Sequence, residues 1–365
     1  MKNWFTYVGP TLLMAPLMAW VPACDDPGDG TPGVDAGTEP TVDAGPGVDA
    51  DPAGPLFRSC VDGEMPDGLP TVDWSNSVND VITLADPWHS AQDIIAATAT
   101  EAVLAGKFSY GDISKDLEGE RIEVWIDDCA GGYRMLGERT TDSDGRMALA
   151  LAAGELPGAG AYGVRFRVMG DDSVASAVLR VYPPGTQLIV FDIDATLTTS
   201  DTELVGQVVS EILSGEVAVP EAREGAAEIV ELRNGQHGYE IVYLTGRPYL
   251  LDALTRTWLD DLDIPGGTLH LTDDVADSWP SDSAVGDYKA AFLQEILAKG
   301  FTFYAAYGNA TSDIHAYEVA GIPKERTFIL GSHGGEADTI DLGEGYTAHI
   351  DDIRDEPAAE QPFRR

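Results

Sequence analysis

The sequence is poor in cysteine and in positive charge. Only three cysteines occur in 365 residues, and 22 Lys and Arg stand against 62 Asp and Glu, which gives a net charge of −40. Three cysteines cannot build a disulfide scaffold. The charge argues against nucleic-acid binding, which needs Lys and Arg at the phosphates, and against a polybasic dock onto anionic lipid. Hydrophobic residues make up 44% of the chain, so its length predicts about two domains with real cores.

The N-terminus has the composition of an export signal. Lys2 precedes an apolar run within residues 1–23, and this run is too short for a comfortable membrane span. Val21-Pro22-Ala23 before Cys24 resembles a bacterial lipobox, whose cysteine is lipidated. We therefore expect an exported cell-envelope lipoprotein, on the periplasmic face or at the cell surface, whose membrane anchor is Cys24. An ordinary cleaved signal peptide is the alternative.

Residues 24–55 are predicted to be a disordered acidic linker. From residue 25 on, this segment is rich in Gly and Pro, holds eight Asp or Glu and no Lys or Arg, and repeats the triplet Val-Asp-Ala. Such a composition cannot bury enough apolar surface to fold, and its like charges extend it. It is typical of a spacer between a surface anchor and a folded body.

The two cysteines beyond Cys24 are Cys60 and Cys129. Export makes a disulfide between them possible. Two unpaired buried cysteines are the alternative, because their spacing along the chain does not determine their geometry. The sequence contains no CxxC pair, which argues against a zinc or redox motif.

Residues 56–183 have the pattern of a β-sandwich domain. Apolar residues alternate over 121–126, 162–168 and 175–181, and Asp144-Gly145 between such runs is a hairpin signal. Short alternating strands with Gly-rich turns favour a sandwich. Residues 91–104 fit either a helix or an edge segment. No catalytic cluster stands out in this region.

After Pro183-Pro184-Gly185 the pattern changes to an α/β alternation. Continuous apolar runs, typical of strands buried on both faces, occur at 188–191, 241–244, 268–271, 303–307 and 327–330. Helical patterns lie between them at 222–232, 249–262, 288–299 and 312–320. This alternation predicts a parallel sheet. Ligands of such sheets bind beyond the carboxyl ends of the strands.

Polar residues follow these apolar runs. Asp192 and Asp194 come directly after the first run, where one carboxylate can act as a nucleophile and the other as an acid and base. Thr245 and Gly246 end the second run with a hydroxyl and a backbone N–H that suit a phosphate oxygen. Lys289, at a helix start, can neutralise phosphate charge.

The fourth run ends before Asn309 and Asp313, whose oxygens suit a hard cation such as Mg²⁺. Each residue has a structural alternative: Asp313 can cap its helix, Thr245 can be a strand-end hydroxyl and Lys289 a surface charge. Their order at successive strand ends and helix starts favours a single site.

These motifs resemble those of the haloacid dehalogenase-like (HAD-like) phosphohydrolases, and most closely those of the lipin-type phosphatidate phosphatases, whose catalytic domain is called LNS2. The resemblance covers about residues 186–332 and rests on FDIDATLTTSD at 191–201, YLTGRP at 243–248 and AAYGNATSDIHAYEVAGIP at 305–323. It implies a HAD-like domain over 184–332. Lipins also carry an immunoglobulin-like β-sandwich, to which residues 56–183 would correspond. Residues 333–365 are predicted to be a solvated acidic tail.

The resemblance implies a phosphoric monoester hydrolase that uses Mg²⁺. Asp192 would form an aspartyl-phosphate, and Asp194 would protonate the leaving group and then activate water. The metal would be held by Asp192, by Asp194 through its carbonyl, by Asn309 and by Asp313. The phosphate would be bound by Thr196, Thr245, Gly246 and Lys289. Ala195 departs from the glycine that is usual between the second Asp and the Thr.

The substrate is the least determined part of this prediction. The gaps between motifs are short, which predicts a minimal cap and an open site suited to a head group on a membrane. The prediction is therefore phosphatidate or a related lipid phosphate, reached through the lipid anchor because a basic patch is missing. Two alternatives stay open: a phosphatase for a soluble or polymer-linked phosphomonoester, and an LNS2 module that binds phosphatidate without turnover.

Overall fold

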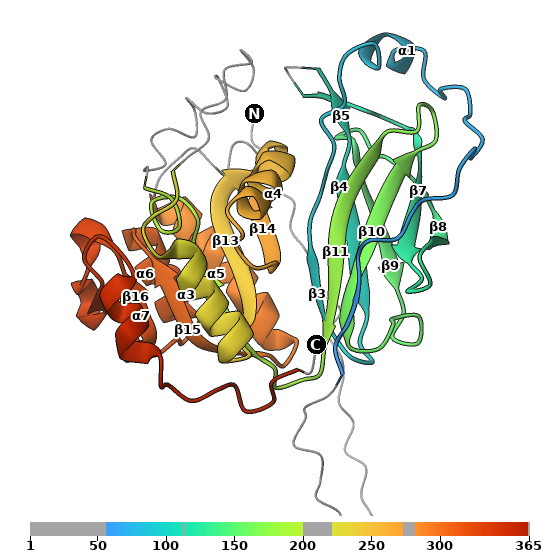
Figure 1. Ribbon diagram of the computed structural model, residues 1–365. Helices are drawn as coiled ribbons and strands as arrows, with labels where there is room; N and C mark the ends of the chain where they lie inside the picture. The colour runs from blue at the N-terminus through green and yellow to red at the C-terminus, as the bar shows by residue number, and fades with distance from the viewer. Residues whose placement is uncertain (1–55, 112–113, 200–220, 273–281, 364–365) are drawn as a thin grey trace, which may run out of the picture. The chain divides into compact units, whose positions relative to one another are not determined.

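The computed structural model describes residues 56–111, 114–199, 221–272 and 282–363 (Figure 1). The predicted signal segment, the proposed lipidation site Cys24 and the acidic linker lie outside these residues. So does most of the connection between the first two motifs, on which the predicted minimal cap partly depends. In the described part of the chain, no helix has the length and apolar character needed to cross a membrane.

Most strand pairs of the first region are antiparallel, as the alternating pattern predicts, whereas β1 pairs with β10 and β3 with β11 in parallel. A six-stranded sheet has the order β3-β11-β10-β7-β8, with β1 paired to β10, and a three-stranded sheet has the order β2-β4-β9. A short pair is formed by β5 and β6. The bounds are β1 (Arg58–Cys60), β2 (Ser90–Ala91), β3 (Ile94–Ala97), β4 (Ala102–Lys107), β5 (Ser109–Tyr110), β6 (Lys115–Asp116), β7 (Arg121–Asp127), β8 (Tyr133–Thr140), β9 (Arg146–Leu151), β10 (Gly160–Val168) and β11 (Val174–Tyr182).

The structure settles two points that the sequence left open in this region, residues 91–104 and the two cysteines, and it corrects the predicted hairpin. Residues 91–104 contain no helix and instead supply strands to both larger sheets. The Asp144-Gly145 turn does not close a hairpin, because β8 before it and β9 after it belong to different sheets. Cys60 and Cys129 are joined by a disulfide. One short helix, α1 (Asn79–Ile82), lies in the connection between β1 and β2.

The second region contains a parallel sheet, again as predicted. Its strand order is β14-β13-β12-β15-β16-β17, and every described pairing in it is parallel. The strands are β12 (Gln187–Phe191), β13 (Glu240–Pro248), β14 (Thr268–Thr272), β15 (Thr302–Gly308), β16 (Thr327–Ile329) and β17 (Ile340–Asp341). The central strands are buried on both faces, which is why they read as unbroken apolar runs.

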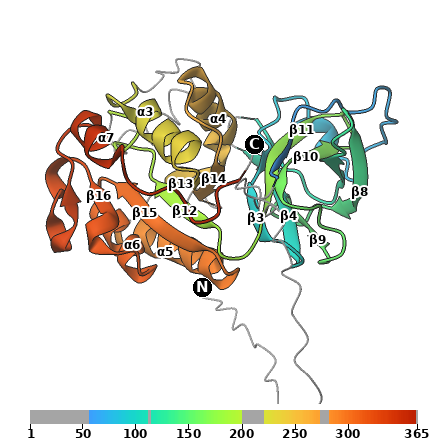
Figure 2. The same ribbon diagram turned by 60° about the horizontal axis from the view of Figure 1, so that its bottom comes forward.

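Helices cover both faces of this sheet (Figure 2). The helices are α3 (Ala226–Glu231), α4 (Asp252–Asp261), α5 (Asp282–Ala298), α6 (Thr311–Val319) and α7 (Thr347–Ile353). Apolar residues of α3, α4 and α7 pack with Ile189 and Phe191 of β12, whereas those of α5 and α6 pack with Leu188 and Val190. The alternation of side chains along β12 thus divides the core between two helix layers.

The segment after residue 332 is not the solvated tail that the sequence predicted. It supplies β17 to the edge of the sheet and α7 to one face. Tyr346, Ile350 and Ile353 are buried in the same core cluster as β12, and Phe363 packs on Tyr182. Nine of its 33 residues are Asp or Glu, but Tyr346, Ile350 and Ile353 are spaced to face the core, and their burial fixes the segment.

Candidate functional site

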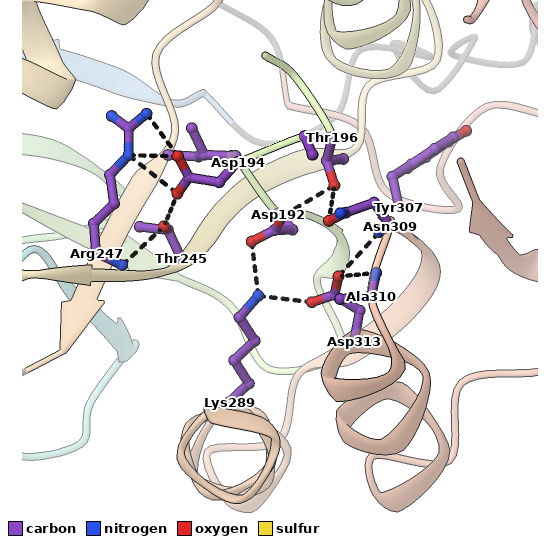
Figure 3. Close-up of polar contacts among 12 residues, drawn as sticks. Asp192, Asp194, Thr196, Thr245, Arg247, Lys289, Tyr307, Asn309, Ala310 and Asp313 are labelled. Atoms are coloured by element: carbon purple, nitrogen blue, oxygen red, sulfur yellow. Dashed lines mark hydrogen bonds and ion pairs between the residues drawn. The ribbon is translucent and has the colours of Figure 1, made fainter. Parts of the chain in front are cut away.

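The predicted site residues meet at the carboxyl edge of the parallel sheet (Figure 3). Asp192 and Thr196 follow β12, Thr245 lies near the end of β13, and Asn309 follows β15. Parallel strands end at one edge, so residues far apart in sequence converge there. Most of these side chains are buried: Thr196 and Thr245 are fully shielded and Asp192 is 3% exposed.

Lys289 stands at the centre of the cluster. Its ammonium, on α5, donates to Asp192 Oδ1 at 2.7 Å and to Asp313 Oδ1 at 2.6 Å. The side chain is almost fully buried, which excludes the alternative of a solvated surface charge. A buried ammonium between two carboxylates satisfies the rule that buried charges are paired.

Asp313 holds the loop that carries Asn309. Its Oδ2 accepts the backbone N–H of Asn309 at 3.0 Å and of Ala310 at 3.1 Å, while Oδ1 accepts Lys289. A Cβ at Gly308 would lie 2.6 Å from the Cβ of Asp313, so glycine is needed for this close approach. Both oxygens of Asp313 are engaged, and this side chain positions its neighbours.

Oxygen atoms converge where Asn309 meets the loop after β12. The Thr196 hydroxyl donates to Asp192 Oδ2 at 2.9 Å and lies 3.2 Å from the Asn309 amide. The same amide faces the main-chain oxygen of Asp194 at 3.0 Å and Asp192 Oδ2 at 3.3 Å. With its nitrogen turned toward these acceptors, Asn309 donates to them. With the Asn309 amide oxygen turned inward, the oxygens of Asn309, Asp192 and the Asp194 main chain face one another.

The carboxylate of Asp194 points away from that group, toward Arg247. Arg247 Nε and Nη2 donate to Asp194 Oδ1 at 3.0 and 2.9 Å, and the Thr245 hydroxyl donates to Asp194 Oδ2 at 3.0 Å. Arg247 itself is held by Thr255 of α4 at 3.0 Å. A two-point guanidinium contact is among the strongest that a carboxylate makes. Sequence reasoning missed Arg247, although it stands directly after Thr245 and Gly246 in the motif.

Burial and charge set the protonation of the central pair. Burial, reinforced by the charges of Asp313 and Asp194 and opposed by Lys289, raises the pKa of Asp192 to about 7. Burial alone would lower the pKa of Lys289, but Asp192 and Asp313 raise it above its usual range. Lys289 therefore stays charged, while Asp192 titrates near neutral pH.

Two further residues hold the loop after β12, and neither was predicted. Arg223 Nη2 donates to the main-chain oxygen of Ala195 at 2.7 Å, and the Tyr346 hydroxyl donates to that of Thr196 at 3.1 Å. Tyr346 comes from the segment that was expected to be a tail. Ala195 between them has a φ of +52°, a left-handed conformation that favours glycine. Their signals lie outside the motifs, which explains why the sequence did not reveal them.

Two family models match the two folded regions. Residues 189–331 match the LNS2 domain of PITM 1-3, and residues 87–181 match the β-sandwich domain of PITM 1-3. The chain carries an LNS2 domain. The LNS2 match runs from within β12 to just past β16 and includes Asp192, Asp194, Thr245, Lys289 and Asp313, but not Tyr346. The resemblance to LNS2 domains is thus confirmed.

Curated relatives share both the sandwich region and the LNS2 region. Human membrane-associated phosphatidylinositol transfer protein 3 is 31% identical over 271 residues, which are 72% of this chain and 26% of the relative. Protein retinal degeneration B of Drosophila melanogaster is 30% identical over 269 residues, 72% of this chain and 20% of the relative. The chain thus matches only about a quarter or a fifth of these relatives' length.

Among solved structures, a chimeric titin Z1Z2 is 17% identical and has a TM-score of 0.19. The match covers 27% of this chain and 94% of that chain and is too weak to indicate a shared fold.

These relatives correct the prediction of an enzyme. The sequence resemblance implied a phosphoric monoester hydrolase of the lipin type, whereas the relatives with descriptive names are phosphatidylinositol transfer proteins and not phosphatases. The geometry gives a physical reason for the correction. The group that was expected to act as acid and base, Asp194, has its carboxylate bound by Arg247 and Thr245. In this structure the Asp194 carboxylate is thus engaged by a guanidinium and a hydroxyl.

Proposed function

We propose that this LNS2 domain binds the phosphomonoester head group of a membrane lipid, phosphatidate being the simplest, without hydrolysing it. The observation that carries the proposal is the pairing of Asp194 with Arg247 and Thr245 beside an otherwise complete phosphate-binding edge. Such an edge, on a sheet that we take to be HAD-like, keeps the means to hold a phosphate. Lys289 supplies the cation, and the backbone near Gly246 and the Thr196 hydroxyl supply donors.

The charge of the site indicates that a cation takes part. Three carboxylates, Asp192, Asp194 and Asp313, stand against two cations, Arg247 and Lys289. A phosphate dianion cannot approach such a cluster unless positive charge is added or Asp192 is protonated. Head-group binding should therefore depend on a metal ion or on pH.

Mg²⁺ fits the oxygen atoms at this edge. It would be held by Asp192, by the main-chain oxygen of Asp194 and by the Asn309 amide with its oxygen turned inward. The inward-facing atom of this amide lies 3.0 to 3.3 Å from the other two. Neighbouring ligands of an octahedral Mg²⁺ are about 3 Å apart, given metal–oxygen distances of about 2.1 Å. Asp313, whose oxygens are both engaged, would steady this set. The ion would supply the positive charge that the phosphate needs.

The proposal can be tested with the full chain and vesicles. Flotation should show binding to phosphatidylcholine vesicles that contain phosphatidate, weaker binding when phosphatidylinositol replaces it, and a gain of several-fold with Mg²⁺ over EDTA. Inorganic phosphate release from phosphatidate should stay at background. Equal binding to all three vesicle types would contradict head-group recognition, and phosphate release would contradict binding without turnover.

The variants that test the site are chosen so that the buried pair of Lys289 and Asp192 is removed as a whole. Lys289→Met alone would leave buried carboxylates unpaired, at a cost of about 3–5 kcal/mol in stability. The double variant Lys289→Met, Asp192→Asn keeps the net charge of the cluster and leaves Asp313 with its backbone donors at Asn309 and Ala310, so it should fold, yet lose at least tenfold in phosphatidate binding. Lys324→Met, which breaks an exposed pair with Glu318, is the control and should bind as the parent does.

A further inference from the structure

The sandwich carries a cluster of apolar side chains that point into water. Val78, Val81 and Leu84, on and around α1, are 53%, 67% and 85% exposed in the part of the chain that the structure describes. We call these three residues the apolar turn. Leu84 is the most exposed of the large hydrophobic side chains among the described residues. An apolar group held in water has an unfavourable free energy, which burial in another phase relieves.

Buried polar groups hold this turn in place. Asn79, on the inward side of α1, is 1% exposed, and its Nδ2 donates to Glu120 Oε1 at 2.6 Å and to the Glu118 carbonyl at 2.9 Å. Glu120, itself buried, also accepts the backbone N–H groups of Ser75 and Asn76. Ile82 of α1 also packs against the sandwich core, whereas Val78, Val81 and Leu84 stay exposed.

The apolar turn is connected to the carboxyl edge of the parallel sheet. The chain after Leu84 pairs with β5, through Gly111 N–H to the Asp86 carbonyl at 2.9 Å. Beyond β5, the Ser114 hydroxyl lies 2.9 Å from the hydroxyl of Tyr249, which directly follows β13. Tyr249 is two residues from Arg247. Figure 1 shows α1 and α4, the helix that follows this end of β13, both in the upper part of the view.

We infer that the apolar turn inserts into the lipid bilayer that presents the head group to the LNS2 site. Three side chains on one turn offer far less than the roughly 800 Å² per partner of a stable protein interface. Insertion into the headgroup and acyl boundary requires no complementary surface. This inference rests on the proposed head-group site for its choice of partner, and on Asn79 and Glu120 for its geometry.

The chemistry of the turn specifies the kind of membrane contact. Asp80 and Asp86 are exposed beside the apolar residues, and the whole chain carries a net charge of −40. Contact with anionic lipid is therefore opposed by charge and driven by apolar burial. Raising the salt concentration should strengthen vesicle binding, which is the opposite of what a basic membrane-binding patch shows.

The first experiment measures flotation of the full chain and of two double variants. The vesicles are phosphatidylcholine with about 10% phosphatidate. Val81→Ser with Leu84→Ser should weaken binding at least tenfold. Val174→Ser with Ile340→Ser, which changes exposed apolar residues elsewhere, is the control and should bind as the parent does. Equal binding by all three proteins overturns the inference.

The second experiment reports insertion independently of affinity. Leu84→Trp should show a blue-shifted emission and be quenched by brominated phosphatidylcholine, whereas Val319→Trp on α6 should not. Absence of quenching at Leu84→Trp on vesicles that the protein demonstrably binds overturns the inference and leaves the head-group proposal standing. If the parent chain does not bind glycerol 3-phosphate, a soluble form of the head group, the head-group proposal is contradicted instead. A dimer that disappears in the serine variant also overturns the inference, because a second copy would then cover the turn.

Discussion

Ala195 adopts a backbone conformation that its side chain disfavours. Its φ is +52°, its methyl group is buried, and its carbonyl accepts the Arg223 guanidinium. The left-handed conformation costs an L-residue other than glycine about 1–2 kcal/mol. Similar strain at a turn beside functional side chains is common, because the surroundings fix the conformation. Here Arg223 and the Tyr346 hydroxyl provide that fixation on either side of the turn.

Replacing Ala195 by glycine should cost almost nothing in stability. Relief of about 1–2 kcal/mol of backbone strain offsets the greater freedom of glycine in the unfolded chain, about 0.4–1 kcal/mol, and the lost burial of a methyl group, about 0.8 kcal/mol. Ala316→Gly, in the middle of α6 and equally buried, is the control and should cost about 1–2 kcal/mol. Urea unfolding measures both. If Ala195→Gly lowered the free energy of unfolding as much as Ala316→Gly does, the backbone at Ala195 would not be strained.

At the residue scale, the sequence predicted which side chains meet but not how they are paired. Asp192 and Asp313 could be placed together because each follows a strand of one parallel sheet, whereas Lys289 was expected at a helix start and lies in the middle of α5. The orientation of Asp194 could not be predicted, because the contact with Arg247 depends on Thr255 of α4 and on side-chain directions that no spacing records.

At the scale of elements, α7 shows how far a sequence pattern can mislead. Its surroundings are acidic and lack a long apolar run, so the segment was expected to be solvated. Instead it buries His349 against Tyr307, whose hydroxyl lies 3.1 Å from His349 Nε2, and against Phe328. The strands of the parallel sheet were predictable because continuous apolar runs are distinctive. A seven-residue helix at the sheet's margin is too short to give a clear period.

The packing of α7 should make the protein less stable in mild acid. Burial, followed by the nearby Arg233, lowers the pKa of His349 to about 4. The unfolded chain gains a proton at this histidine below about pH 6.5, whereas the folded chain does so only near pH 4, so stability falls as pH drops between these values. The contribution is on the order of 3 kcal/mol.

His349→Gln should therefore flatten the dependence of stability on pH between about 6.5 and 4. The measurement is the free energy of unfolding in urea at several pH values. His333→Gln is the matched control, because His333 is half-exposed and pairs with Glu336 at the surface. An unchanged slope in His349→Gln would show that His349 does not stay neutral in the folded protein.

At the scale of the whole described molecule, the sandwich and the LNS2 region share a core although two family models match them separately. Ile95, Ala97 and Tyr182 of the sandwich belong to one buried cluster with Leu188 and the helices α5 and α6. The Tyr182 hydroxyl donates to Glu240 at the start of β13. The sequence predicted two domains from a change of period at Pro183, and period alone carries no information on whether two domains have a common core.

Asp93 is the charged centre of this shared region. Its carboxylate is fully buried, lies 2.9 Å from Arg256 Nη2 of α4 in an ion pair, and accepts Arg180 Nη1 at 3.1 Å. It also accepts the backbone N–H of Val178 in β11 and of Leu269 in β14. Burial alone would raise the pKa of Asp93, but the two arginines hold it below its usual value. One carboxylate thus joins elements of both regions.

Asp93→Asn should destabilise both regions together. The change leaves Arg256 and Arg180 without their common counter-charge in a buried setting, which costs about 3–5 kcal/mol. Because the core is shared, calorimetry should show a single transition in the parent and the same single transition at lower temperature in the variant. Glu138→Gln, which breaks a partly exposed pair with Arg121, is the control and should cost at most about 1 kcal/mol. Two separate transitions in the parent would show instead that the sandwich and the LNS2 region unfold independently, and that Asp93 stabilises an interface rather than a common core.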